Sequence, residues 1–176
     1  MIPGRVREDP PSTACLRNIL LWIEATGLGH FMRESGPWTY ALVNTAHILG
    51  VSSLFGSLLV LDLRLLGVWR RVRLSDLASA VSPVAMTGFA IAATTGAAML
   101  ATKATAYLGN PFLLIKFPAI ALGLINVGAL NRTRAWKEMG RRELSSREGR
   151  QLAVFGGVSL ACWLTAITCG RMIAFW

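Results

Sequence analysis

The residue with the clearest chemical potential is a histidine in the middle of an apolar segment. His47 follows Trp38 by nine residues, which places it near the centre of an apolar stretch, where ionisable side chains are costly and call for a functional explanation. A neutral imidazole binds haem iron or copper. Asn44 precedes His47 by three residues and shares its helical face. We therefore predict a cofactor-binding site at His47 with Asn44 as its polar neighbour.

Two cations in other apolar segments extend this predicted site. Lys116 lies about a turn and a half into one segment, and Arg171 lies about a turn from the end of another. Both are expected in the same half of the membrane as His47, where they would bind carboxylates such as the propionates of haem. The predicted cofactor-binding residues are therefore His47, Asn44, Lys116 and Arg171.

Thioether side chains offer further metal ligands. Met86 and Met99, with Met32 and Met172, are candidates to complete a site at His47, because thioethers bind haem iron and copper. The predicted cofactor is one haem b or a copper ion. The competing interpretation is that His47 hydrogen-bonds across a helix bundle while Lys116 and Arg171 extend to the membrane interface, with no cofactor.

An acidic and a basic residue mark the end of the same segment. Asp62 and Arg64 are two residues apart and do not share a helical face, so each is expected to pair with another helix or with the basic connections. We interpret both as structural anchors that fix topology.

The elements that must position these residues are membrane helices. The 176 residues are 53% hydrophobic and 15% charged, with a mean hydropathy of +0.50, which is too apolar for a water-soluble domain of this size. Four segments are long enough to cross about 30 Å of hydrocarbon. They run over residues 38–61, 83–101, 111–130 and 151–173. The predicted fold is an all-α integral membrane bundle of four transmembrane helices.

The segments outside the spans are shorter. Residues 1–12 read as a loose polar tail, and residues 13–25 as an interfacial amphipathic helix, within a single membrane domain over 13–176. Residues 33–37 read as a polar hinge. A short separate helix is expected over 74–82, because Pro83 begins the second span.

The net charge of +9 belongs to this membrane pattern and not to nucleic-acid binding, because the basic residues cluster between apolar segments. The first and third connections hold eleven of the Lys and Arg residues, and the other side holds seven. The positive-inside rule then predicts a bacterial inner membrane protein with both termini on the periplasmic side.

Sequence motifs of catalysis are missing. The chain contains no glycine-rich phosphate loop, nucleophile elbow or H-E-x-x-H motif. The three cysteines show neither C-x-x-C nor zinc spacing. An enzyme that acts without a cofactor is therefore not expected.

Several short stretches resemble a family of small bacterial membrane proteins of about four spans. The resemblance covers nearly all of the chain from Leu16 onward. It rests on residues 44–50 (NTAHILG), 62–67 (DLRLLG), 109–111 (GNP) with Lys116, and 170–171 (GR). The family has no established activity, so it implies architecture and candidate positions only. Residues 116–134 are also similar to the copper-resistance protein D family, which implies copper uptake.

Three functions follow from these observations. The first is cofactor binding at His47 for electron transfer or metal handling. The second is an accessory subunit that packs against a larger membrane complex, or against copies of itself, in the lipid bilayer. The third is a transporter for a small solute or ion.

Overall fold

The computed structural model describes residues 11–142 and 144–175, with side chains from residue 17 onward. Most of the predicted polar tail over residues 1–12 therefore lies outside the described residues. The chain forms two compact units. Unit 1 contains residues up to 45 together with 94–109, and unit 2 contains residues 46–93 together with those from 110 onward. Each is described by itself.

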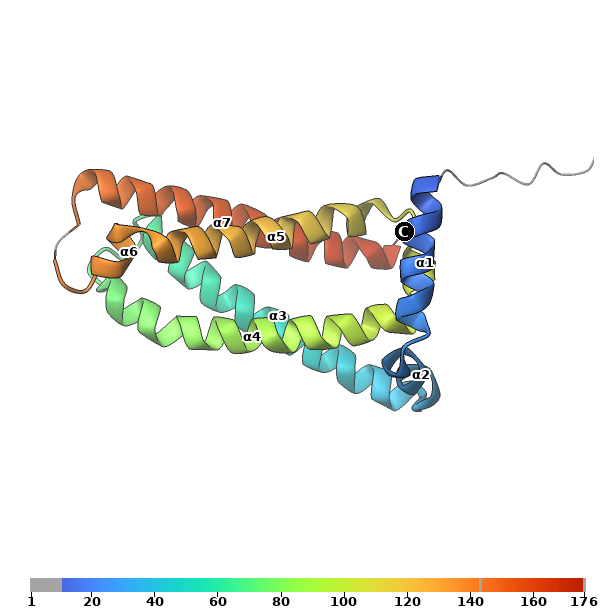
Figure 1. The fold of residues 1–176 in the computed structure, drawn as a ribbon. Helices are drawn as coiled ribbons and strands as arrows, with labels where there is room; N and C mark the ends of the chain where they lie inside the picture. Colours follow the sequence, from blue (N-terminus) through green and yellow to red (C-terminus); the bar gives the residue numbers. More distant parts are fainter. Residues whose placement is uncertain (1–10, 143, 176) are drawn as a thin grey trace, which may run out of the picture. The chain divides into compact units, whose positions relative to one another are not determined.

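All regular structure in the described ranges is helical. The elements are α1 Pro11–Glu24, α2 Gly27–Glu34, α3 Gly36–Leu65, α4 Leu74–Thr102, η1 Ala104–Tyr107, α5 Pro111–Arg132, α6 Arg134–Glu138, α7 Ser146–Met172 and η2 Ile173–Phe175. Figure 1 shows the four long helices α3, α4, α5 and α7. These four are long and apolar enough to cross a membrane. The prediction of an all-α membrane protein with four spans is confirmed.

The helix boundaries differ from the predicted ones in three places. The expected short helix over 74–82 is continuous with the second span, so that α4 contains Pro83 in its interior. The fourth span begins five residues earlier than expected, because Ser145 and Glu148 form a reciprocal capping box. Residues 27–34, read in part as a hinge, form the short helix α2.

In unit 2, α3 and α4 meet through two glycines. A Cβ atom on Gly88 would lie 2.6 Å from the backbone nitrogen of Leu54, and one on Gly50 would lie 2.8 Å from that of Ala92. Only hydrogen at both positions permits so close an approach. Gly88 and Ala92 of α4 therefore pack directly against α3.

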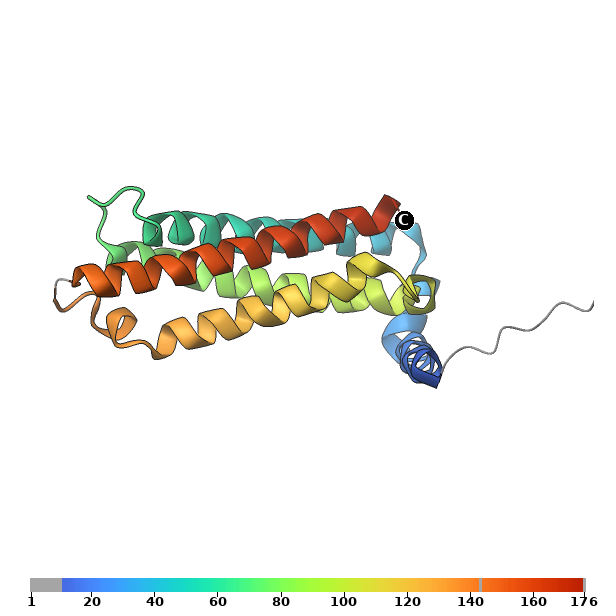
Figure 2. The ribbon, with the colours of Figure 1, turned by 90° about the horizontal axis from the view of Figure 1, so that it is seen from above.

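The other helix pair of unit 2 is α5 with α7, which lie side by side in Figure 1. The Trp163 indole packs on Gly123, where an added Cβ would come within 3.3 Å of Cε2. The buried Asn126 side chain donates a hydrogen bond of 2.9 Å to the carbonyl of Phe155. Figure 2 shows α6 as a short turn in the connection between the two helices.

Ion pairs order the rest of this connection. Arg142 donates to the carboxylates of Glu138 and Glu148. The hydrogen bonds from Arg142 and then Arg134 hold the pKa of Glu138 below its ordinary range. The charges predicted between the third and fourth spans are therefore partly paired.

The apolar core of unit 2 has two clusters. The first joins α3, α4, α5, α6 and α7 at the end where α3 finishes and α7 begins; its buried members are Leu61, Leu65, Leu74, Ala78, Leu130, Ala135 and Leu152. The second surrounds Trp163 with Leu54, Leu58 and Ala85. Between them the clusters tie every helix of the unit into one bundle.

Unit 1 joins α1, α2 and η1 to the start of α3 and the end of α4. Glu24, the last residue of α1, accepts hydrogen bonds of 2.8 Å from the backbone N–H and the hydroxyl of Thr105 in η1. Gly29 of α2 packs so closely that a Cβ would lie 2.5 Å from the Glu24 carbonyl oxygen and 2.9 Å from that of Ala101. The interfacial elements are thus fixed to the ends of the two spans.

Candidate functional site

His47 lies on α3 in unit 2 and is half-buried. Its ring is hydrogen-bonded to the backbone of Ala92 on α4, close to the point where Gly50 and Gly88 bring the two helices together. This contact across the bundle was the structural interpretation of His47. It also resembles the arrangement of metal-binding histidines, which commonly donate one ring N–H to a backbone carbonyl.

Lys116 of α5 is the candidate whose charge acts on His47. The two side chains are close enough for their charges to interact. The Lys116 ammonium group lies against α7, and a Cβ on Gly170 would be 3.2 Å from Nζ. No carboxylate among the described residues forms an ion pair with Lys116. Two basic groups from α3 and α5 therefore share a region of the span interior.

Arg171 lies at the end of α7, and Asn44 lies on α3 three residues before His47. Arg171 follows Gly170 on α7, but it is exposed and its guanidinium carbon lies 4.9 Å from the ring centroid of Phe175. Asn44 is half-buried on α3, in the part of the helix that belongs to unit 1. Among these candidates, Lys116 is close enough for its charge to act on the His47 ring.

The predicted methionine ligands Met86 and Met99 belong to different units. Met86 is 71% exposed on the outer surface of α4. Met99 belongs to unit 1, where it lines a cavity together with Met32. The described residues contain no cluster of three or more His, Cys, Asp or Glu side chains. A metal at His47 would need donors from outside this residue set.

Asp62, predicted as a structural anchor that pairs with another helix or with the basic connections, faces α7. It is only 3% exposed and points toward α7, where the Ser159 hydroxyl lies beside its carboxyl group. Among the described residues, neither Asp62 Oδ2 nor Ser159 Oγ has a hydrogen-bond partner of good geometry. Gly156 makes room for this contact, since a Cβ there would lie 3.0 Å from the Asp62 carbonyl oxygen. A buried carboxyl that faces a hydroxyl was not foreseen from the sequence.

Arg64 does act as an anchor. Its guanidinium group donates hydrogen bonds to the carbonyl of Val72 at 2.8 Å and to that of Arg70 at 3.3 Å. These bonds fold the first connection back onto the end of α3. The structural interpretation of Arg64 agrees with this geometry.

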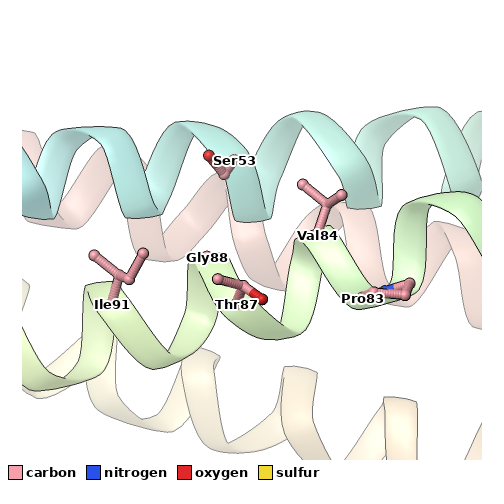
Figure 3. A pocket seen from close by; sticks show the side chains of 6 residues that line it. All are labelled: Ser53, Pro83, Val84, Thr87, Gly88 and Ile91. Atoms are coloured by element: carbon pink, nitrogen blue, oxygen red, sulfur yellow. The ribbon is translucent and has the colours of Figure 1, made fainter.

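Neither His47 nor Lys116 lines the two cavities described next. The first, of about 280 Å³, is an open groove on unit 2. Figure 3 shows Ser53 of α3 above Thr87 and Gly88 of α4, with Val84 and Ile91 on either side. The second, of about 560 Å³, lies in unit 1. Of the predicted site residues, Met32 and Met99 line the second cavity.

Sequence reasoning missed the residues of the unit 1 cavity. Arg33 lies on α2, Tyr40 on α3, and Lys103 and Tyr107 at the two ends of η1, and only their position at the ends of predicted spans could have drawn attention to them. Burial, followed by the nearness of Tyr40, raises the pKa of the Tyr107 phenol. The cavity therefore presents two cations and a phenol that stays protonated at neutral pH.

Comparison with known proteins adds no assignment: the chain matches no protein-family model, no curated protein and no solved structure.

Proposed function

We propose that this membrane protein binds one cofactor at His47 and Lys116, with haem b as the specific candidate, and serves electron transfer or metal handling. The observation that carries the proposal is that two basic side chains inside the spans are close enough for their charges to interact. Lys116 has no carboxylate partner among the described residues, although a charge in a membrane span is costly unless it is paired.

The chemistry of haem b suits this pair. Its iron takes a histidine as axial ligand, and its propionates are carboxylates that would supply the missing counter-charge for Lys116. The backbone hydrogen bond to Ala92 fixes the orientation of the His47 ring, as expected of a ligand held by its surroundings. Copper stays the alternative cofactor, and it needs ligands beyond His47 because Met86 points away from the bundle.

The absorption spectrum of the detergent-purified protein tests this proposal, recorded oxidised and after dithionite reduction, with metal analysis of the same sample. We expect a haem band in stoichiometric amount. His47→Ala should lose the band while the protein still inserts and folds. His30→Ala is the matched control, because His30 is exposed on α2 and pairs with Glu34. A colourless, metal-free protein would overturn the proposal.

Lys116 provides a second test. Lys116→Met keeps the length and apolar character of the side chain but removes its charge, so it should weaken haem retention without abolishing folding. Retention equal to that of the wild type would remove Lys116 from the site.

One observation favours a second candidate function, that of an accessory subunit. The groove of Figure 3 is lined by the exposed residues Ser53 and Thr87, and small side chains of this kind let another transmembrane helix approach closely. Ser53→Leu would fill the groove. A native-gel complex that dissociates in this variant would support a partner helix, and an unchanged complex would exclude the groove as its contact.

We also propose a bacterial inner membrane location with both termini on the periplasmic side. This orientation is supported by the excess of Lys and Arg in the connections between α3 and α4 and between α5 and α7.

A further inference from the structure

The cavity of unit 1 has the dimensions of a ligand site. Its volume is about 560 Å³, within the ~300–1,000 Å³ that is typical of small-molecule pockets. It is lined by α2, the first turns of α3, the last turn of α4 and η1. The His47–Lys116 pair contributes nothing to it, so the cavity is independent of the function proposed above.

The cavity lies where a membrane surface must be. α3 begins at Gly36 and α4 ends at Thr102, and both residues line the cavity. Helix ends of this kind sit at the level of the lipid headgroups. A molecule in the cavity would therefore meet the polar part of the bilayer.

The lining is positively charged. Arg33 and Lys103 both contribute to it, and no acidic residue does. The nearby Glu24 carboxylate is occupied by the N–H and hydroxyl of Thr105, and these hydrogen bonds lower its pKa. It therefore stays ionised and hydrogen-bonded to η1, and although its charge also acts on Arg33, the residues that line the cavity carry two positive charges and no negative one.

Arg33 is held in position by two backbone carbonyl groups, and its charge also interacts with the Glu24 carboxylate. Nη2 donates to the Glu24 carbonyl at 2.9 Å and Nη1 to the Ala101 carbonyl at 3.5 Å. Both acceptors are uncharged backbone groups. A guanidinium group has five N–H donors, so these contacts leave donors for an anion.

The remaining lining residues divide into donors and an apolar floor. Tyr40 and Tyr107 lie near one another, and the raised pKa of Tyr107 keeps its hydroxyl protonated as a donor. Met32 is 3% exposed and lines the cavity with Met99. An anionic head joined to an apolar body matches this division.

We propose that the unit 1 cavity binds the phosphate of an anionic phospholipid, with Arg33 and Lys103 as its charge partners and the two phenols as hydrogen-bond donors. Phosphate is the shared chemistry of a lipid headgroup and of free phosphate. The position at the ends of two spans and the methionine floor favour the lipid.

The test uses the full chain, purified and delipidated in detergent. Its thermal unfolding is followed while short-chain phosphatidylglycerol, short-chain phosphatidylcholine or inorganic phosphate is added. We expect saturable stabilisation by phosphatidylglycerol at lower concentration than by phosphatidylcholine. Lys103→Gln should weaken the apparent affinity about fivefold, because a basic residue at a membrane surface contributes on the order of that factor.

The choice of variants separates loss of the site from loss of folding and from general attraction to anionic lipid. Lys103 is exposed, so Lys103→Gln should fold even if Arg33→Gln does not. Arg147→Gln removes a charge from an exposed position at the start of α7 and reports general attraction between the protein and anionic lipid. Tyr107→Phe removes one donor and should also weaken binding.

Each outcome decides the proposal. A lipid effect that falls in Lys103→Gln but not in Arg147→Gln supports it. Equal stabilisation by inorganic phosphate overturns the lipid as occupant and keeps the phosphate site. Three outcomes overturn the site: phosphatidylglycerol does not stabilise the protein, phosphatidylcholine stabilises it equally, or the stabilisation falls equally in Lys103→Gln and Arg147→Gln.

Discussion

The contact between α3 and α4 makes a quantitative prediction for Gly88→Ala. The new Cβ would lie 2.6 Å from the Leu54 nitrogen and 2.8 Å from the Gly50 oxygen, whereas ordinary contacts begin near 3.4 Å. Both obstructing atoms belong to backbone, so no side chain can rotate away. The helices would have to separate by about 0.8 Å, the difference between the ordinary and the available distance.

Such overpacking costs about 1–3 kcal/mol, partly offset by the better helix propensity of alanine, about 1 kcal/mol. Gly56→Ala on α3 is the matched control, since a Cβ there meets nothing within 4 Å and only the propensity gain applies. The two variants should therefore differ by about 1–3 kcal/mol, or roughly 2–12 °C in Tm.

A thiol-reactive dye can follow unfolding in detergent, because Cys169 is buried in the folded protein. We expect Gly88→Ala to unfold at a lower temperature than the wild type, and Gly56→Ala at the same or a higher one. If Gly88→Ala were as stable as Gly56→Ala, the close approach of the two helices would be refuted.

Three further predictions concern charged groups and topology. Asp62→Asn should unfold in detergent at the wild-type temperature or above. The amide keeps the shape of the buried carboxyl group, which has no cationic partner among the described residues. A large fall in the unfolding temperature would show that such a partner exists. The pKa of Glu24 lies below its ordinary value of 4.5, so its contribution to holding α1 on η1 is complete above that pH and lost as the pH falls. Limited proteolysis of α1 should become faster in the wild type as the pH falls, whereas the rate in Glu24→Gln should not change with the protonation of residue 24. The same dependence of rate on pH in both proteins would contradict this role of Glu24. An impermeant thiol reagent should label Ser145→Cys only after the membrane is opened, and labelling in intact cells would reverse the orientation.

The spans could be predicted because hydrophobic length is a property of local sequence. The ends of the spans were harder to predict, because capping signals and hydrophobicity point to different residues there. The Ser145–Glu148 capping box starts α7 within a polar stretch that hydrophobicity alone assigns to the connection. Pro83 suggested a break, yet α4 accommodates it.

Glycine was the most ambiguous residue type. Gly27 and Gly29 read as a chain break, but Thr26 caps α2 by accepting a hydrogen bond from the Gly29 N–H. Gly29 is needed for close packing against Ala101 and not for flexibility. Only the tertiary contact distinguishes these two uses.

For the candidate site, the depth of each residue in the membrane could be estimated from the sequence. The side chains that each residue contacts could not. Helix rise placed His47 and Lys116 at compatible depths, and in the structure they are close enough for their charges to interact. The sequence could not assign Asp62 to the α7 side of its helix, because Asp62 follows the buried Leu61 and the buried face is broad enough to include both. Its neighbour Ser159 is 97 residues away in sequence, and a single sequence holds no record of such a pairing.

The packing of Trp163 on Gly123 also constrains how this protein can change over evolutionary time. The indole occupies the space that a side chain on α5 would otherwise fill. Positions 123 and 163 therefore compete for the same space in the core. A larger residue at position 123 is tolerable only after the residue at position 163 has become smaller. Homologues should show these two positions varying together, with the bulky residue moving from one helix to the other and the sum of their sizes nearly constant.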